Sequence, residues 1–222
     1  MTRELWTAVD DYLEEQLLSP DTALDAALAA NAAGGLPAID VSPPQGKLLT
    51  LLARLQGARA ILEIGTLGGY STICLARALP ADGTLVTLEI DPEHAQVALG
   101  NLERAGLAAL VDLRVGPALS TLPRLVQEGA GPFDLVFIDA DKRSSAEYVT
   151  WALELTRPGS AIIVDNVIRA GALADPRSDD PSVRGSRRLL DLLAAEPRLS
   201  STALQTVGGK GYDGFTLSLV VG

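Results

Sequence analysis

Cysteine and histidine are nearly absent from the sequence, with one of each among 222 residues. The single cysteine, Cys74, excludes an internal disulfide and suits a reducing compartment. It lies in STICLARAL, among apolar residues at helical spacing. We therefore expect Cys74 to be a small core residue rather than a nucleophile.

Long hydrophobic runs and an excess of basic residues are also missing. No apolar run approaches the roughly 20 residues needed to cross a bilayer. The N-terminal stretch MTRELWTAVDDYLEEQ is acidic and amphipathic, unlike a signal or transit peptide. The 28 acidic and 18 basic residues give a net charge of -10, which repels nucleic acid and anionic membranes at long range. We expect a cytoplasmic protein with a small-molecule partner, and neither nucleic acid nor a membrane.

The length suits one domain, in which residues 1–57 form a helical cap and residues 58–222 form the core. Five apolar residues would share one face of a first helix: Leu5, Val9, Tyr12, Leu13 and Leu17. Pro20 is expected at the first position of a second helix, which NAAGGLP ends. A third helix should follow Pro43 and Pro44.

From residue 60 onward, short apolar runs alternate with helical stretches. The apolar runs are AILEIG, TLVTLEID, LVDLRVG, FDLVFIDAD and SAIIVDN. Continuous hydrophobic strands separated by helices predict an α/β fold, with a mostly parallel sheet covered by helices on both faces. LSSTALQTV and YDGFTLSLVV would add a terminal pair of strands. The segment 175–185 is the most loop-like of the chain and is expected to be mobile.

Four of these predicted strands end in or near an acid: Glu63, Glu89, Asp139 and Asp165. In such folds, ligands bind beyond the carboxyl ends of the strands. One acid at a strand end is unremarkable, but four on the same edge of a sheet indicate a site.

A glycine-rich turn, EIGTLGGYS, follows the first parallel strand and opens a helix. The G-x-G-x-x-G spacing of a dinucleotide site fails because position 67 is leucine, and the Gly-Lys-Ser/Thr ending of a phosphate loop is missing. Glu89, at the end of the next strand, could accept hydrogen bonds from both hydroxyls of a ribose. These features favour an adenosyl ligand without a pyrophosphate. The alternative is that the glycines only make a tight strand-to-helix turn.

The motifs IDADK and VDN end two successive predicted strands, which should be neighbours in the sheet. Asp139, Asp165 and Asn166 would then provide three hard oxygen donors, which favour Mg²⁺ or Ca²⁺ over zinc. The alternative is that the acids of IDADK cap the next helix. We assign that capping role to Asp141 and the metal role to Asp139.

Two further residues, Lys142 and His94, can each be interpreted in a structural or in a functional way. Lys142 is either a solvated lysine or a general base, whose pKa a nearby cation would lower. His94, in DPEHAQVAL, is expected to be structural or exposed, or to line the outer wall of the nucleoside pocket.

ILEIGTLGGYS, LVTLEID, VGPAL, FDLVFIDADK and SAIIVDNV, in this order, resemble the cation-dependent O-methyltransferases. That family includes catechol O-methyltransferase and the plant caffeoyl-coenzyme A enzymes, with many bacterial members. The resemblance extends from about residue 39 to the C-terminus. It implies a Rossmann-like class I methyltransferase fold with a seven-stranded sheet, S-adenosylmethionine as cofactor and a divalent cation. Mg²⁺ is the expected ion, with Ca²⁺ or Mn²⁺ as alternatives.

The resemblance also implies roles for individual residues. The implied cofactor-binding residues are Val41, Glu63, Gly65, Gly69, Ser71, Glu89, Ala118 and Asp139. Asp139, Asp165 and Asn166 match the metal ligands, and Lys142 matches the base. The implied reaction transfers a methyl group to one hydroxyl of a small, catechol-like vicinal-dihydroxy acceptor, in a chain expected to be a homodimer.

Arg169 departs from the catechol-type pattern, in which an aromatic residue follows the DNV segment. With Arg184, Arg187 and Arg188 nearby in the sequence, it raises the alternatives of an anionic acceptor or of simply solvated arginines. Two other functions stay open: methylation of a hydroxylated uridine in transfer RNA, and a non-catalytic cofactor-binding protein.

Overall fold

The computed structural model describes residues 2–222, and its centre is a seven-stranded sheet in the order β3-β2-β1-β4-β5-β7-β6. Five strands are parallel: β1 (Ala60–Ile64), β2 (Thr84–Glu89), β3 (Val111–Val115), β4 (Leu135–Ile138) and β5 (Ala161–Val164). β7 (Gly211–Val220) runs antiparallel to β5 and pairs with β6 (Leu199–Gly208). The expected α/β class and terminal strand pair are confirmed.

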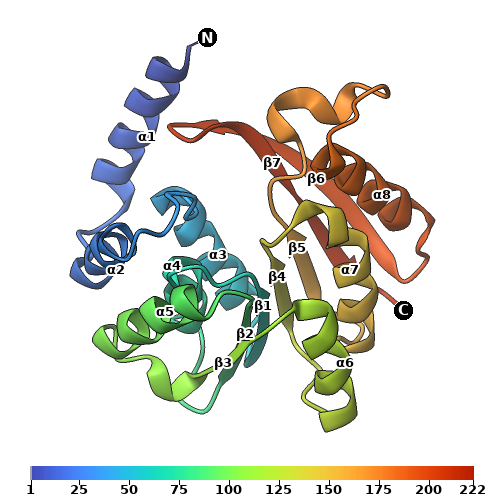
Figure 1. Cartoon of the computed structure of the whole chain (residues 1–222), viewed down its shortest axis with the longest axis horizontal. Coiled ribbons are helices and arrows are strands. Elements are labelled where there is room, and N and C mark those ends of the chain that lie inside the picture. Colours follow the sequence, from blue (N-terminus) through green and yellow to red (C-terminus); the bar gives the residue numbers. More distant parts are fainter. Residues whose placement is uncertain (1) are drawn as a thin grey trace.

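Alternating strand residues enter hydrophobic cores on opposite faces of the sheet. Leu62 and Val136 pack with α6 (Ala118–Glu128), α7 (Ser145–Glu154) and α8 (Pro181–Ala195). Ile61 and Phe137 pack with α3 (Pro43–Leu55) and α4 (Tyr70–Ala76), and Cys74 lies in this second core, as expected. Figure 1 shows the two groups of helices on either side of the sheet. Both faces are covered, which explains why the strands are almost continuously apolar.

The helices α1 (Arg3–Leu17) and α2 (Thr22–Ala33) precede α3, and α2 packs on α5 (Pro92–Arg104). Pro20 does not open α2, which is a correction: the Asp21 carboxylate accepts the N–H groups of Ala23 and Leu24, so that Asp21 caps a helix beginning at Thr22. The division of the chain at residues 57 and 58 as a cap and a core stays a prediction.

The first helix, α1, is amphipathic, but none of its residues is buried. Its predicted apolar face is exposed along its whole length, with exposed fractions from 39% at Leu13 to 71% at Leu17. The tip of the β6–β7 hairpin reaches α1, as Figure 1 shows. There the Asp10 carboxylate accepts the Gly209 N–H at 2.7 Å. The hairpin tip is therefore hydrogen-bonded to a polar residue of α1 and does not cover the apolar face of that helix.

The segment 175–185 is a loop only as far as Asp180, which corrects the expected boundary. The Asp180 carboxylate accepts the N–H groups of Ser182 and Val183 and caps α8, which begins at Pro181. Within residues 2–222, no helix combines the length and the apolar character that crossing a membrane requires.

Candidate functional site

The glycine turn between β1 and α4 passes closely over two neighbouring segments. Gly65 has φ +100°, and a Cβ there would lie 2.1 Å from the Asp139 carbonyl oxygen. Gly68 faces Asn31 in the same way, with a Cβ position 1.8 Å from the Asn31 Oδ1. Neither site has room for a side chain. Leu67, the residue that breaks the dinucleotide spacing, also has a positive φ, of 51°.

Glu89 fixes this turn from the end of β2. Its Oε2 accepts the N–H groups of Thr66 at 3.1 Å and Leu67 at 2.7 Å. Its Oε1 accepts the Asp91 N–H at 3.0 Å. Three backbone donors satisfy a carboxylate that is 6% exposed and lines the cavity described below. Glu89 therefore presents a carboxylate of fixed orientation to whatever the cavity holds.

Glu63 has a different environment, although it also lies at a strand end. Its carboxylate is completely buried and accepts the hydroxyl groups of Ser71, Thr72 and Thr87. Burial raises the pKa of the Glu63 carboxyl to about 7. Glu63 does not line the cavity described below. Gly69 has φ +84° and precedes the first residue of α4, and it does not line the cavity either. Hydrogen bonds connect Glu63 to the cavity through Ser71, which lines it, and through Thr87, which is bonded to the cavity residue Thr66.

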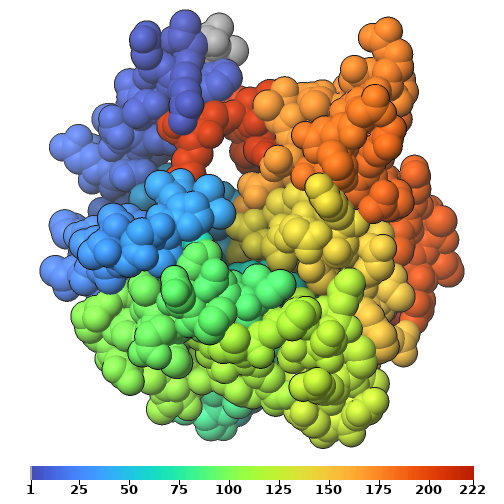
Figure 2. Space-filling model, in the orientation of Figure 1, coloured from blue at the N-terminus to red at the C-terminus, as the bar shows by residue number. Residues whose placement is uncertain are grey.

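A cavity of about 650 Å³ opens beyond the carboxyl ends of β1, β2 and β4, within the size range of ligand sites. Seven predicted site residues line it besides Glu89: Val41, Gly65, Ser71, Ala118, Asp139, Lys142 and Asn166. His94 also lines it, with Nδ1 3.8 Å from the Glu89 Oε1. Figure 2 shows the surface hollowed between the N-terminal helices (blue) and the segment following β5 (orange). The cavity thus brings together six of the eight residues expected to bind a cofactor with Lys142 and Asn166, whereas Glu63 and Gly69 do not line it and Asp165 lines a neighbouring cavity.

Asp139, Asp165 and Asn166 follow the neighbouring strands β4 and β5, as expected from the sequence. Asp165 is 4% exposed, and burial together with the Asp139 carboxylate raises its pKa to about 6. Asn166 has φ 54°, a conformation that asparagine tolerates better than most residues. Two facing carboxylates and an amide oxygen form a hard-oxygen donor set that suits Mg²⁺. In the described part of the chain, no group of three or more His, Cys, Asp or Glu side chains could hold a metal.

Lys142 is 8% exposed, and its ammonium donates to the Asp139 Oδ1 at 2.7 Å. The ammonium is therefore a buried partner of Asp139 rather than a solvated charge. Asp141 accepts the Ser144 N–H at 3.1 Å and the Tyr148 hydroxyl, so its predicted capping role is confirmed. Tyr148 packs in the core and also lines the cavity.

A second cavity of about 340 Å³ adjoins the first and shares Ile39, Asp40, Val41 and Asn166 with it. Sequence reasoning missed two residues there, Gln45 and Lys210. Gln45, in the first turn of α3, donates to the Asp165 Oδ2 at 2.7 Å. Lys210, at the hairpin tip, donates to the Asp40 carbonyl oxygen. Two signals were present: a polar residue after the Pro-Pro start of a helix, and a lysine between glycines.

A buried polar relay also escaped sequence reasoning. The Asn31 amide donates to the Asp40 Oδ1 at 2.9 Å, and the Asn101 amide donates to the Asn31 Oδ1 at 3.0 Å and to the Gly68 carbonyl oxygen at 2.7 Å. The relay joins α2, α5 and the segment around Asp40 to the glycine turn. An asparagine inside the alanine-rich ALAANAAGG was its one sequence signal.

Sequence comparisons relate the chain to known O-methyltransferases. A family model described as O-methyltransferase matches residues 21–220. The chain is 53% identical over 220 residues to a catechol O-methyltransferase from Niastella koreensis, covering 99% of this chain and 100% of that one.

Two solved structures are similar over nearly the whole chain. The crystal structure of an O-methyltransferase from Bacillus cereus in complex with SAH has a TM-score of 0.97 and 55% identity, covering 99% of this chain and 100% of that one. That of TomG from Streptomyces achromogenes, involved in tomaymycin synthesis and in complex with SAM, has a TM-score of 0.97 and 53% identity, covering 100% of both chains. The chain belongs to the O-methyltransferase family of the caffeoyl-coenzyme A and catechol type, and it is an S-adenosylmethionine-dependent O-methyltransferase.

Proposed function

We propose that the protein methylates one hydroxyl of a small vicinal-dihydroxy, catechol-like acceptor with the help of a divalent cation. One observation carries the proposal: Asp139, Lys142 and Asn166 line the same cavity as Glu89 and the glycine turn, with Asp165 beside them. A methyl donor and a hydroxyl acceptor could therefore meet there. The relative from Niastella koreensis, named catechol O-methyltransferase, supports this acceptor class.

In this proposal, the cofactor lies along the carboxyl ends of β1 and β2. The fixed Glu89 carboxylate accepts the ribose hydroxyls, and Ser71, at the start of α4, faces the amino-acid portion. Val41 and Ala118 are the apolar contacts with the methionine portion and the adenine. Gly65 allows the Asp139 backbone to approach, since any larger residue would collide with the Asp139 carbonyl oxygen. When bound, S-adenosylmethionine supplies the methyl group on its sulfonium.

Asp139, Asp165 and Asn166 are the proposed metal ligands. Two carboxylates next to each other with raised proton affinity at Asp165 suit a site that is completed by a cation. Mg²⁺ is the expected ion for this donor set, with Ca²⁺ or Mn²⁺ as alternatives. When bound, the ion would lower the pKa of the acceptor hydroxyl and orient two adjacent oxygens. Gln45 holds the Asp165 carboxylate through its hydrogen bond at 2.7 Å.

Lys142 is the proposed general base. In its neutral form, the Lys142 Nζ would take the proton of the hydroxyl that is methylated, and the hydrogen bond to Asp139 keeps this nitrogen at the edge of the cavity. Much of the rate would come from holding the acceptor oxygen in line with the methyl group, because fixed positions replace a bimolecular encounter.

A methyl-transfer assay tests the proposal with catechols, hydroxycinnamoyl esters, flavonoids and transfer RNA, each with Mg²⁺ and with chelator. We expect a catechol to be methylated only with the metal. Asp165→Ala should abolish turnover while calorimetry still detects S-adenosylmethionine binding, and Asp191→Asn, on the exposed side of α8, is the matched control. Unchanged turnover after thorough chelation would refute the metal role, and methylation of transfer RNA alone would refute the acceptor class.

We also propose that the protein is a homodimer. The exposed apolar face of α1 supports this, since contiguous apolar surface of this kind marks interaction sites. A monomer mass by light scattering at micromolar concentration would refute it. The cytoplasmic location expected from the sequence stays a prediction.

A further inference from the structure

Arg169 lies on the wall of the larger cavity, three residues after Asn166. Five acidic side chains line this cavity against three basic ones, Lys142, Arg143 and Arg169. Lys142 is engaged by Asp139, and Arg143 is exposed. Arg169, the third basic residue, is half-buried, and its side chain donates no hydrogen bond to any residue within 2–222.

The other arginines near this segment have structural partners. Arg184 pairs with Asp179, and Arg187 donates to the Leu173 carbonyl oxygen at 3.1 Å. Arg188 donates to the Arg143 carbonyl oxygen at 2.7 Å. These three arginines are therefore bonded within the protein rather than simply solvated.

The guanidinium of Arg169 is not saturated in this way. Its Nε is buried and has no hydrogen-bond partner within residues 2–222. Its Nη1 forms a long ion pair with the Asp213 Oδ2 at 3.9 Å, a distance too great for a hydrogen bond. A buried donor without a partner is costly, and a movement of the guanidinium that brings it to an acceptor atom of a ligand would remove that cost.

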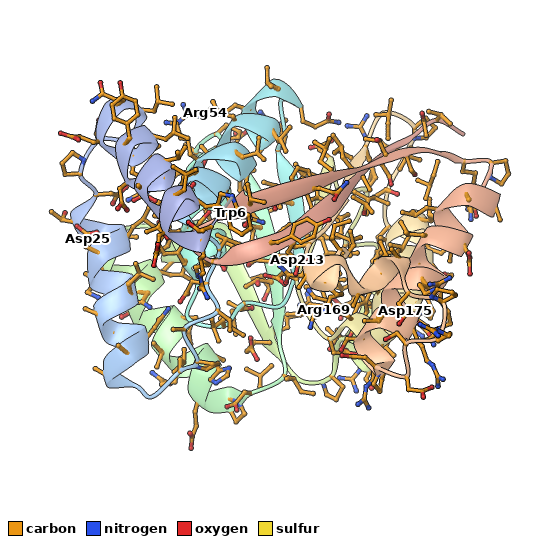
Figure 3. All side chains as sticks on the ribbon, turned by 90° about the horizontal axis from the view of Figure 1, so that it is seen from above. Trp6, Asp25, Arg54, Arg169, Asp175 and Asp213 are labelled. Carbon is orange, nitrogen blue, oxygen red and sulfur yellow. The ribbon has the colours of Figure 1, made fainter. Side chains whose placement is uncertain are left out.

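The backbone of Arg169 is held firmly. The Asp213 Oδ1 accepts the N–H groups of Ile168 and Arg169 at 2.9 Å each, and that of Gly214 at 3.0 Å. Figure 3 shows Arg169 and Asp213 next to each other. Arg169 and Ala170 both have φ 54°, an uncommon conformation for residues with a Cβ that tends to persist at functional sites. The start of the side chain is therefore fixed on the cavity wall rather than free in solvent.

We infer that Arg169 binds a carboxylate of the acceptor, so that the preferred substrates are aromatic vicinal diols that carry a carboxylate. This inference rests on the proposed function. An anionic substituent would be repelled by most of the acid-rich cavity wall and is tolerated only beside a cation. A guanidinium also matches a carboxylate geometrically, because two parallel N–H donors can reach its two oxygens.

The test compares catechol with 3,4-dihydroxybenzoate, which differ by one carboxylate. In Arg169→Gln, kcat/KM for 3,4-dihydroxybenzoate should fall about tenfold or more, because a charge-assisted pair is lost. For catechol it should change less than about twofold, and Arg169→Lys should recover part of the loss for the carboxylate. Arg184→Gln, an arginine paired with Asp179 away from the cavity, is the matched control and should change neither value.

Equal losses for both acceptors in Arg169→Gln would overturn the inference, since they indicate a structural role. A selective loss in Arg143→Gln with none in Arg169→Gln would also overturn it. If the unaltered enzyme methylates neither compound, the proposed function fails. The role of Arg169 is then tested by calorimetry, which measures how tightly the SAH-loaded protein binds each compound. In that case, 3,4-dihydroxybenzoate must bind more tightly than catechol, and only in the presence of Arg169.

Discussion

Gly68→Ala is expected to disrupt the cofactor turn through a side chain that lies far away in the sequence. A Cβ at position 68 would lie 1.8 Å from the Oδ1, 2.2 Å from the Cγ and 2.4 Å from the Nδ2 of Asn31. Unlike Gly65, Gly68 does not have a positive φ. Steric exclusion by Asn31 is therefore the reason for glycine at this position.

The cost follows from the hydrogen bonds that Asn31 would have to give up. Moving its amide breaks the bond to Asp40 at 2.9 Å and the bond from Asn101 at 3.0 Å, both in buried surroundings. Leaving a buried polar group unpaired costs about 1–3 kcal/mol, so two such losses amount to about 2–6 kcal/mol.

A double-mutant cycle by urea unfolding measures this effect with Gly68→Ala, Asn31→Ala and the double variant. Asn31→Ala removes the side-chain atoms that the new Cβ at position 68 would strike. Gly68→Ala should therefore lower the free energy of unfolding by at least about 1 kcal/mol less in the Asn31→Ala background than in the unaltered protein. Gly65→Ala is the comparison, since its Cβ would strike the Asp139 backbone carbonyl, 2.1 Å away, which no side-chain change removes. Additive costs for the two alanines would refute the reasoning.

Two further predictions concern the buried acids. Glu63 has a pKa of about 7 in the folded protein, against 4.5 for an unperturbed glutamate. Between pH 4.5 and pH 7, its carboxyl group therefore binds a proton in the folded protein but not in the unfolded chain. The stability of the protein should therefore rise as the pH falls from 8 toward 5, and this part of the slope should be missing in Glu63→Gln when urea midpoints are compared; identical slopes would contradict it. Glu89→Gln should weaken S-adenosylmethionine binding about tenfold by calorimetry, because a neutral amide replaces the charged acceptor; unchanged affinity would exclude contact with the cofactor.

The centre of the sheet could be predicted from the sequence because β1, β2, β4 and β5 are short, apolar and separated by helices. Both faces are buried, so each strand carries a local signal that does not depend on its partners. The start of α2 was predicted wrongly for a local reason. Pro20 suits a first helical position, but the Asp21 side chain is the stronger cap, and the helix begins after the residue that caps it.

The edge of the site was also predictable, since acids at the carboxyl ends of parallel strands must meet there. The supporting contacts were not. Gln45 reaches Asp165 across 120 positions, and Asn101 reaches Asn31 across 70. Contacts of this kind depend on how α2, α3 and α5 pack on the sheet, and neither periodicity nor spacing encodes that packing.

The clearest limit of sequence reasoning is the contrast between Glu63 and Glu89. Both are acids at the ends of adjacent parallel strands, and the sequence treats them as equivalent. Hydroxyl groups surround Glu63, and these can donate to a carboxylate while burial still favours its protonated form. Backbone N–H groups donate to Glu89, and its carboxylate lines the cavity. The surroundings of each acid are therefore set by donors that the fold brings from other segments, and one carboxylate faces the cavity while the other supports the wall behind it.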